Sequence, residues 1–151
     1  MEESGDKKKR NWKSDFWVGI IVVIITGLLI SLLYGLYTSH LEKGDLKSQI
    51  DPMLRKADSL HDSGEFEEAI EEYESILEII SPKNLPLEYA ITQNNLGNAY
   101  RDLAGVRDKE TNLEKAITAY QEVLKIYTEE KYPIIYQKVS SNLEAAQREL
   151  Q

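Results

Sequence analysis

An uncharged run extends from Phe16 to Tyr37, and the rest of the chain is rich in charged residues. In a helix with about 1.5 Å rise per residue, this run is roughly 33 Å long, enough to cross a hydrocarbon core of ~30 Å. Aromatic residues flank both of its ends, as in interfacial belts: Trp12, Phe16, Trp17, Tyr34 and Tyr37. The pattern predicts a polar tail (1–15), a single transmembrane helix (16–37) and a linker (38–50).

Two alternatives fit the run less well. A signal peptide has an apolar core of about 7–15 residues and small residues at its cleavage site, whereas this run is longer and ends in Gly35-Leu36-Tyr37-Thr38-Ser39. A buried core helix is usually shorter and seldom apolar on all sides. Thr26, the polar residue near the middle of the run, is expected to bond its own helix backbone.

Basic residues are more frequent before the run than after it. Those before it are Lys7, Lys8, Lys9, Arg10 and Lys13, and those that first follow it are Lys43, Lys47, Arg55 and Lys56. Because positive loops favour the cytoplasmic side, the N-terminus is predicted to be cytoplasmic and residues 51–151 to lie on the outer or periplasmic side.

The residues after the run contain an internal repeat. Segment 65–86 aligns without gaps to 112–133 at an offset of 47 residues, and 89–100 aligns to 136–147 at the same offset. Identical residues recur at Glu67/Glu114, Ala69/Ala116, Ile70/Ile117, Tyr73/Tyr120, Leu77/Leu124, Ile79/Ile126 and Pro86/Pro133. Apolar positions follow three- and four-residue steps, which predicts helices, and the acidic residues between them are expected to be solvated.

Boundary residues predict five helices in residues 51–151. Asp51 and Pro52 suit an N-cap and a first helical position, and Ser63-Gly64 suits a helix end. Thr111 and Glu114 match a capping box. The expected helices begin and end at about 51–63, 65–80, 86–104, 111–129 and 133–151.

Short loops and the lack of a strand pattern predict an all-α fold of antiparallel helices. Its residues resemble the tetratricopeptide repeat (TPR). The first repeat carries Ala57, Leu60, Gly64, Phe66, Ala69, Tyr73 and the Pro82 region, and the second carries Leu96, Gly97, Tyr100, Ala116, Tyr120 and Leu124. The resemblance implies an α-α superhelix of about two and a half helical hairpins, whose small residues allow close helix crossing and whose large residues fill the layers between repeats.

The second repeat departs from the usual length. Ala57 and Ala69 are 12 residues apart, whereas Gly97 and Ala116 are 19 apart, and the surplus is a longer loop at 105–111. The last helix is expected to cap the stack, because its outer positions are polar: Gln137, Lys138, Ser141, Glu144, Gln147 and Arg148.

The resemblance further implies a concave groove lined by the first helix of each pair. On one stripe lie Asn94, Asn98 and Arg101, with Asn95 beside them, and further candidates for contact with a peptide are Asn142, Arg148 and Arg55. An asparagine amide can pair with the backbone of an extended peptide. The alternatives are that these residues cap or bond neighbouring helices, as Asn95 could at the repeat interface, or face water. Asp58 would repel a carboxylate, which argues against the carboxylate clamp of some chaperone-binding TPR proteins.

Within the apolar run, Gly27, Ser31 and Gly35 recur every four residues. Small residues at this spacing allow two membrane helices to pack closely, as a homodimer or with another protein. The alternative is that glycine is simply common in membrane helices.

Composition excludes several classes of function. The chain has 18 basic and 26 acidic residues; its first 37 residues hold five and four of these, so the remainder holds 13 and 22, an excess that argues against nucleic acid as a partner. Cysteine is absent, His40 and His61 are isolated, and no phosphate-binding or nucleophile motif occurs, so no catalytic residue, metal or cofactor is predicted.

The sequence therefore predicts a membrane-anchored TPR adaptor that is not an enzyme and binds a segment of a partner protein in its groove. The alternative is a small accessory subunit of a membrane complex for translocation or envelope assembly, held mainly through its transmembrane helix.

Overall fold

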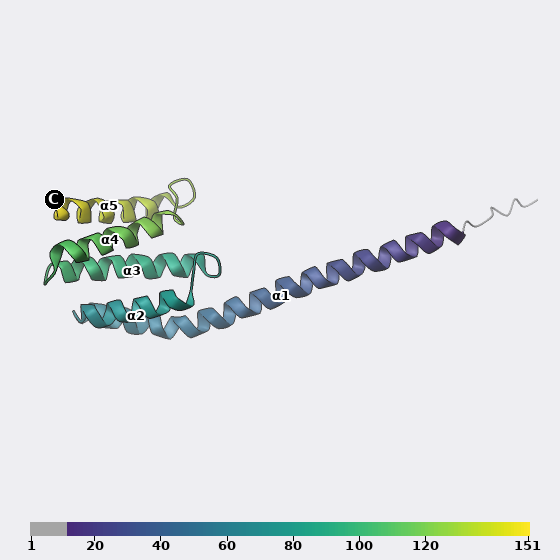
Figure 1. The fold of residues 1–151 in the computed structure, drawn as a ribbon, viewed down its shortest axis with the longest axis horizontal. Coiled ribbons are helices and arrows are strands. Elements are labelled where there is room, and N and C mark those ends of the chain that lie inside the picture. Colours follow the sequence, from purple (N-terminus) through teal and green to yellow (C-terminus); the bar gives the residue numbers. More distant parts are fainter. Residues whose placement is uncertain (1–11) are drawn as a thin grey trace, which may run out of the picture. The chain divides into compact units, whose positions relative to one another are not determined.

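The computed structural model describes residues 12–151, with side chains from Phe16 onward. These residues form α1 (Trp12–Asp62), α2 (Phe66–Ile79), α3 (Pro86–Ala104), α4 (Lys109–Leu124) and α5 (Pro133–Leu150), with no strand among them. The predicted all-α fold is thus confirmed (Figure 1). The chain divides after Glu42 into an N-terminal unit and a compact unit of residues 43–151. Residues 1–11, most of the predicted polar tail, lie outside the described residues.

The N-terminal unit exposes apolar side chains on every side of its helix. Val23 and Leu28, for example, are 70% and 66% exposed, and none of the most apolar stretch is buried. By length and composition, α1 is the one helix in residues 12–151 that could cross a membrane. Thr26 Oγ1 donates to the carbonyl oxygens of Val22 (2.9 Å) and Val23 (3.0 Å), which confirms that this hydroxyl bonds its own helix.

The predicted helix start at Asp51-Pro52 is wrong, because α1 runs through residues 38–50 and keeps Pro52 in its interior. Proline has no N–H to donate to the preceding turn, so packing must favour the helix here. Ile50 is fully buried, and Leu46 and Met53 pack against the same core. The expected linker is therefore helical throughout, and its residues from Lys43 onward belong to the packed unit.

An ion pair further ties this stretch to α3. Lys47 Nζ lies 2.7 Å from Glu88 Oε1. The hydrogen bond from Lys47 lowers the pKa of Glu88, and the same bond raises the pKa of Lys47.

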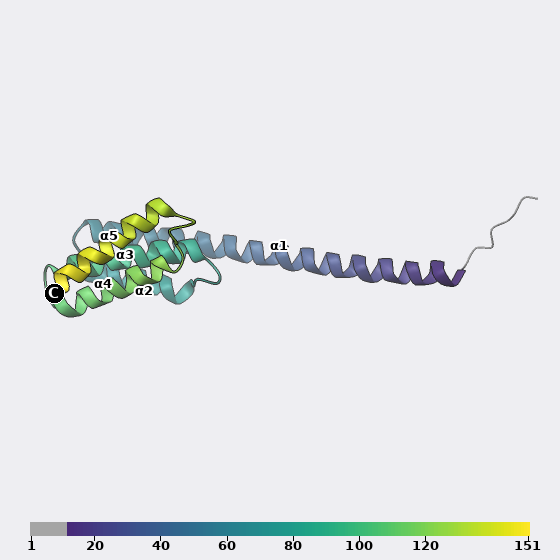
Figure 2. The ribbon, with the colours of Figure 1, turned by 90° about the horizontal axis from the view of Figure 1, so that it is seen from above.

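In the unit of residues 43–151, helices α2 to α5 pack in sequence order (Figures 1 and 2). Seen from above, α2 and α4 lie on one side of α3, and the end of α1 lies on the other (Figure 2). The core contains small residues beside tyrosines, as predicted: Ala57, Ala69, Tyr73, Ala116 and Tyr120, each no more than 1% exposed.

The turn from α1 to α2 forms as predicted around Gly64. Its φ of +81° is in the left-handed region, which glycine adopts without steric cost. The Gly64 N–H donates to His61 O (2.9 Å) and the Glu65 N–H to Leu60 O (3.0 Å). This pair of bonds is a Schellman motif, and it satisfies the last carbonyls of α1.

The predicted capping box at Thr111 and Glu114 is wrong, because α4 begins at Lys109 and its N-cap, Asp108, makes no side-chain cap bond. Asn112, which is 5% exposed, instead donates from Nδ2 to the Arg107 carbonyl oxygen (2.9 Å). This bond closes the loop and allows the helix to begin three residues earlier than the box required.

The fourth helix also ends at Leu124 and not near residue 129. The chain leaves the helical path and buries Tyr127, whose ring meets that of Tyr132 edge to face at 5.0 Å. The limits of α3 and the start of α5 at Pro133 are as predicted. The polar outer positions of α5 are exposed, which suits its predicted role as a cap.

We predict that Gly97→Ala destabilises the packed unit. A Cβ on Gly97 would lie 2.8 Å from Cε1 of the fully buried Tyr120 ring, which is too close without a shift of the helices. Overpacking of this kind costs about 1–3 kcal/mol, more than the ~1 kcal/mol that alanine gains in helix propensity. Thermal unfolding of the full chain in detergent micelles, followed by circular dichroism, should show a melting temperature lower by roughly 5 °C.

Gly44→Ala is the matched control, because Gly44 is also helical and has nothing within 4 Å of an added Cβ. It should leave the melting temperature unchanged or raise it. Equal effects of the two substitutions would contradict the close packing of Gly97 on Tyr120.

Candidate protein-binding groove

A polar pocket opens between the end of α1 and α3, on the face assigned to the groove. Its volume is about 270 Å³. Six residues line it: Asp58, His61, Asp62, Tyr73, Asn95 and Asn98. On α1, Asp58, His61 and Asp62 are spaced to share one helix face, and Asn95 and Asn98 are similarly spaced on α3.

Asp58 is the centre of the hydrogen bonds in this pocket. Its Oδ1 accepts from Tyr73 Oη (2.6 Å) and from Asn95 Nδ2 (3.0 Å). Asp58 of α1 is thus bonded to both α2 and α3. Asn94 Nδ2 donates in turn to Asn95 Oδ1 (3.3 Å). Burial, followed by the bond to Asp58, raises the pKa of Tyr73 far above its usual value.

The same arrangement recurs in the second repeat. Tyr120 Oη donates to Asn98 Oδ1 (2.8 Å), just as Tyr73 donates to Asp58. Tyr120 packs on Gly97 and bonds Asn98, the next residue, and Tyr73 bonds Asp58, which follows the buried small residue Ala57. In both repeats the second helix thereby orients a pocket-lining residue of the first helix.

Charged residues of α1 and α3 also lie close to the pocket residues and to Tyr120. His61 Nε2 lies 2.9 Å from Asp102 Oδ2, which links α1 to α3. Burial raises the pKa of Tyr120 to about 12, and the positive charge of Arg101 opposes this rise.

The structure brings together some of the predicted groove residues. Asn98 lines the pocket, and Asn94 and Arg101 are half-buried on the same helix. Arg55, Asn142 and Arg148 do not line it; Asn142 is half-buried, and Arg55 and Arg148 are exposed. Arg148 Nη1 is 3.6 Å from Glu144 Oε2, a pair within α5. Contact of any of these residues with a peptide stays a prediction.

Sequence reasoning gave no site role to Asp62 or Tyr73, and left Asn95 between the groove and the repeat interface. In the structure Asn95 bonds Asp58 of α1 and also lines the pocket. The repeated tyrosine at an offset of 47 residues was the available signal, since in each repeat its hydroxyl bonds a pocket-lining residue of the first helix.

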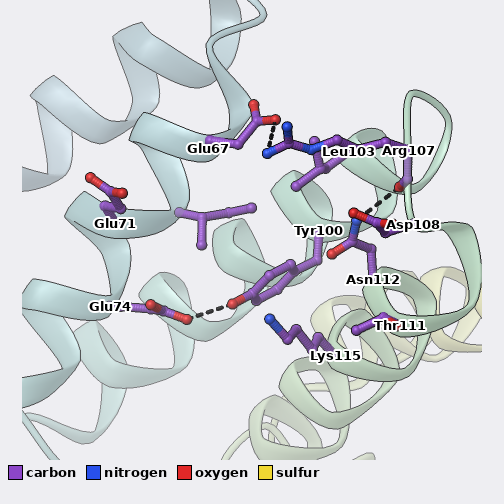
Figure 3. A pocket seen from close by; sticks show the side chains of 11 residues that line it. Glu67, Glu71, Glu74, Tyr100, Leu103, Arg107, Asp108, Thr111, Asn112 and Lys115 are labelled. Carbon is purple, nitrogen blue, oxygen red and sulfur yellow. Dashed lines mark hydrogen bonds and ion pairs between the residues drawn. The ribbon is translucent and has the colours of Figure 1, made fainter.

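A larger cavity of about 500 Å³ lies between α2 and α4 beside the longer loop (Figure 3). Its charged groups are largely paired: Arg107 Nη2 is 2.5 Å from Glu67 Oε1, Tyr100 Oη donates to Glu74 Oε1 at 2.5 Å, and Lys115 Nζ is 4.9 Å from the Tyr100 ring centroid. The expectation that the acidic residues of α2 are solvated is therefore wrong for three of them. Glu67 pairs with Arg107, Glu74 bonds Tyr100, and Glu72 pairs with Lys56 of α1. These pairs make the cavity a weaker candidate for a ligand than the pocket at Asp58.

In residues 16–151 no group of three or more His, Cys, Asp or Glu side chains is placed so that it could hold a metal ion.

Comparison with known proteins bears on the first repeat. A family model described as tetratricopeptide repeat matches residues 50–82, which include the end of α1, the Gly64 turn and α2. The match supports a tetratricopeptide repeat protein. Such repeats are generally interaction modules that bind proteins and are not enzymes. No curated protein and no solved structure gives a significant match.

We predict that the stability of the packed unit falls as the pH rises above 10. The unfolded chain releases its tyrosine protons near pH 10, whereas folding raises the pKa of Tyr73, Tyr100 and Tyr120. The stability gained from these protonated side chains is complete below pH 10 and is lost as the pH rises through the folded-state pKa, which for Tyr120 is about 12.

The test is a titration of the full chain in micelles, with tyrosinate absorbance and helical circular dichroism recorded together. A fraction of the nine tyrosines should titrate only as helicity is lost. Tyr120→Phe should reduce the slope of stability against pH in this range. Release of all tyrosine protons near pH 10 with full helicity would contradict the prediction.

Proposed function

We propose that the chain is a membrane-anchored adaptor that holds a segment of a partner protein in the groove made by the first helices of its repeats. The observation that carries this proposal is the open polar pocket between α1 and α3. Four of its six lining residues, Asp58, His61, Asp62 and Tyr73, belong to the matched repeat. The pocket presents amide, carboxylate and imidazole groups. Docking there would make or break no covalent bond.

The arrangement of Asn98 supports recognition of a peptide backbone. Tyr120 holds the amide oxygen of Asn98, which fixes the direction of a side chain that lines the pocket. An oriented amide loses less rotational freedom on binding, and each backbone hydrogen bond contributes about 0.5–1.5 kcal/mol. Arg101 and Asn94 lie one turn away on either side and extend the polar stripe along α3.

The exposed apolar helix of the N-terminal unit supports a membrane anchor. Removing apolar surface from water gains about 25 cal/mol of free energy per Å². None of the most apolar stretch is covered by protein, so this free energy is not gained in water. A bilayer would cover all sides of it at once. Because basic residues are more frequent before the span than after it, we propose a cytoplasmic N-terminus and a repeat unit on the outer or periplasmic side. Tethering would concentrate the groove near partners in the same membrane.

A second candidate is an accessory subunit held through its membrane helix. The observation that favours it is the open space at Gly27 and Gly35, where an added Cβ would meet nothing within 4 Å. Together with Ser31, they would form a stripe on which another membrane helix, including one from a second copy, could pack.

The two candidates predict different effects of mutation. Under the adaptor proposal, Asn94→Ala with Arg101→Ala should abolish co-purification of the partner, whereas Gly27→Leu with Gly35→Leu should not. Asn98 is left intact because its bond to Tyr120 supports the fold. The matched control is Gln121→Ala with Lys83→Ala, an exposed amide and an exposed base outside α1, α3 and α5. The reverse outcome would support the subunit, and no effect of either pair would exclude both sites.

Membrane placement has its own test. We predict that carbonate washing leaves the full chain in the membrane pellet and that protease added to intact cells cleaves within residues 43–151. Release by carbonate would contradict the anchor. Cleavage only after lysis would reverse the orientation and leave the anchor in place. A mature protein that begins after residue 37 would show a cleaved signal sequence instead.

A further inference from the structure

We infer that the groove binds a basic segment, in which a Lys or Arg side chain enters the pocket beside Asp58 and Asp62 and an aliphatic side chain three to five residues away packs on Leu87 and Ile91. This inference rests on the proposed function, because it names the chemistry of the partner for the same groove. Four observations carry it: the unused acceptors in the pocket, its size, its charge, and the apolar residues that continue its α3 face.

The pocket has acceptor capacity that the fold does not use. Tyr73 and Asn95 both donate to Oδ1 of Asp58, which leaves Oδ2 without a bond from residues 16–151. Asp62 is exposed and makes no side-chain hydrogen bond or ion pair within the same residues. A cationic donor would satisfy both carboxylates through charge-assisted hydrogen bonds.

The size of the pocket suits one side chain. At about 270 Å³ it is smaller than the ~300–1,000 Å³ that sites for small molecules usually occupy. Its wall is mostly polar, so a purely aliphatic side chain would strip hydrogen-bonding groups of water without replacing their bonds.

The charge of the pocket selects the sign of the occupant. Two carboxylates line it, and no Lys or Arg does. Its histidine faces Asp102, a third carboxylate at 2.9 Å, so His61 already has an acidic partner. Arg101 lies one turn further along α3 and does not line the pocket. An acidic segment would meet repulsion here, and a basic one would meet attraction.

Two exposed aliphatic side chains continue the same face of α3 toward its N-terminus. Leu87 is 41% exposed and Ile91 is 44% exposed. Together with Asn94 and Asn98 they recur at three- and four-residue steps, so the four residues lie on one helical stripe. The stripe is therefore apolar at its start and polar where it meets the pocket.

The helical rise sets the spacing of the partner's residues. Ile91 and Asn98 are seven residues apart, or about 10 Å along the helix, and Leu87 is about 6 Å further away. An extended segment advances about 3.3 Å per residue, which places its aliphatic residue three to five positions from its basic residue. This spacing commits the inference to an extended segment, because a helical partner would need seven to eleven residues for the same distances.

The experiment uses the full chain in lipid nanodiscs to select from a random peptide library. Enriched peptides should carry Lys or Arg with an aliphatic residue three to five positions away. A synthetic peptide of the enriched sequence should bind Asp62→Asn about tenfold more weakly, because the charge-assisted hydrogen bond to its basic side chain is lost. Asp62 is preferred to Asp58 for substitution because Asp58 bonds Tyr73 and Asn95.

Matched controls separate the pocket from general charge and general hydrophobicity. Glu68→Gln removes an exposed carboxylate of α2 outside the pocket and should leave affinity unchanged. Leu87→Ser with Ile91→Ser should remove the preference for an aliphatic residue and keep the preference for a basic one. Val106→Ser, at a residue that is 69% exposed in the loop after α3, should change neither.

Each other outcome overturns the inference in a distinguishable way. Enrichment of acidic or uncharged peptides that still depend on Asn94 and Arg101 would refute the basic occupant and leave the adaptor proposal in place. A lack of enrichment above empty nanodiscs, or peptides insensitive to every groove variant, would refute both. Light scattering that shows a dimer dissociated by Asp62→Asn would identify a second copy as the occupant and refute the partner peptide.

Discussion

The close crossing of two helices, with a tyrosine ring held against a small residue, is the interaction on which the rest of the structure depends. Gly97 admits the Tyr120 ring, and the tyrosine hydroxyl then reaches Asn98 on the groove side. Tyr73 reaches Asp58 in the equivalent way beside Ala57. One contact thus buries a large ring and at the same time orients a polar residue that lines the pocket.

The part of the fold that could be predicted from the sequence is the part set by local chemistry. Gly64 ends α1 because a left-handed turn favours glycine, and Pro86 and Pro133 each occupy the first position of a helix. The errors arose where distant packing prevailed over local signals. Pro52 lies inside α1 because Ile50 and Leu46 are anchored in the core on its N-terminal side. The Thr111 capping box does not form, because the buried Asn112 bonds the Arg107 carbonyl oxygen and α4 already begins at Lys109.

The candidate site shows the same division. The stripe of Asn94, Asn98 and Arg101 follows from helical period, and the structure keeps it on one face of α3. The pocket itself could not be predicted, because Asp58, Tyr73 and Asn95 come from three helices and meet only after those helices pack. Charge is likewise redistributed by packing: several glutamates of α2 that look solvated in sequence pair with α1, the loop after α3, or Tyr100.

The central claim, that the groove side of α3 contacts another polypeptide, is tested most directly by site-specific photocrosslinking in intact membranes. A photoreactive residue placed at position 94, where Asn94 lies on the groove stripe, should form a crosslink to a partner protein, and the same residue at the exposed position 121 of α4 should not. A crosslink from position 121 with none from position 94 would contradict the account, because it would place the partner on the opposite layer of helices.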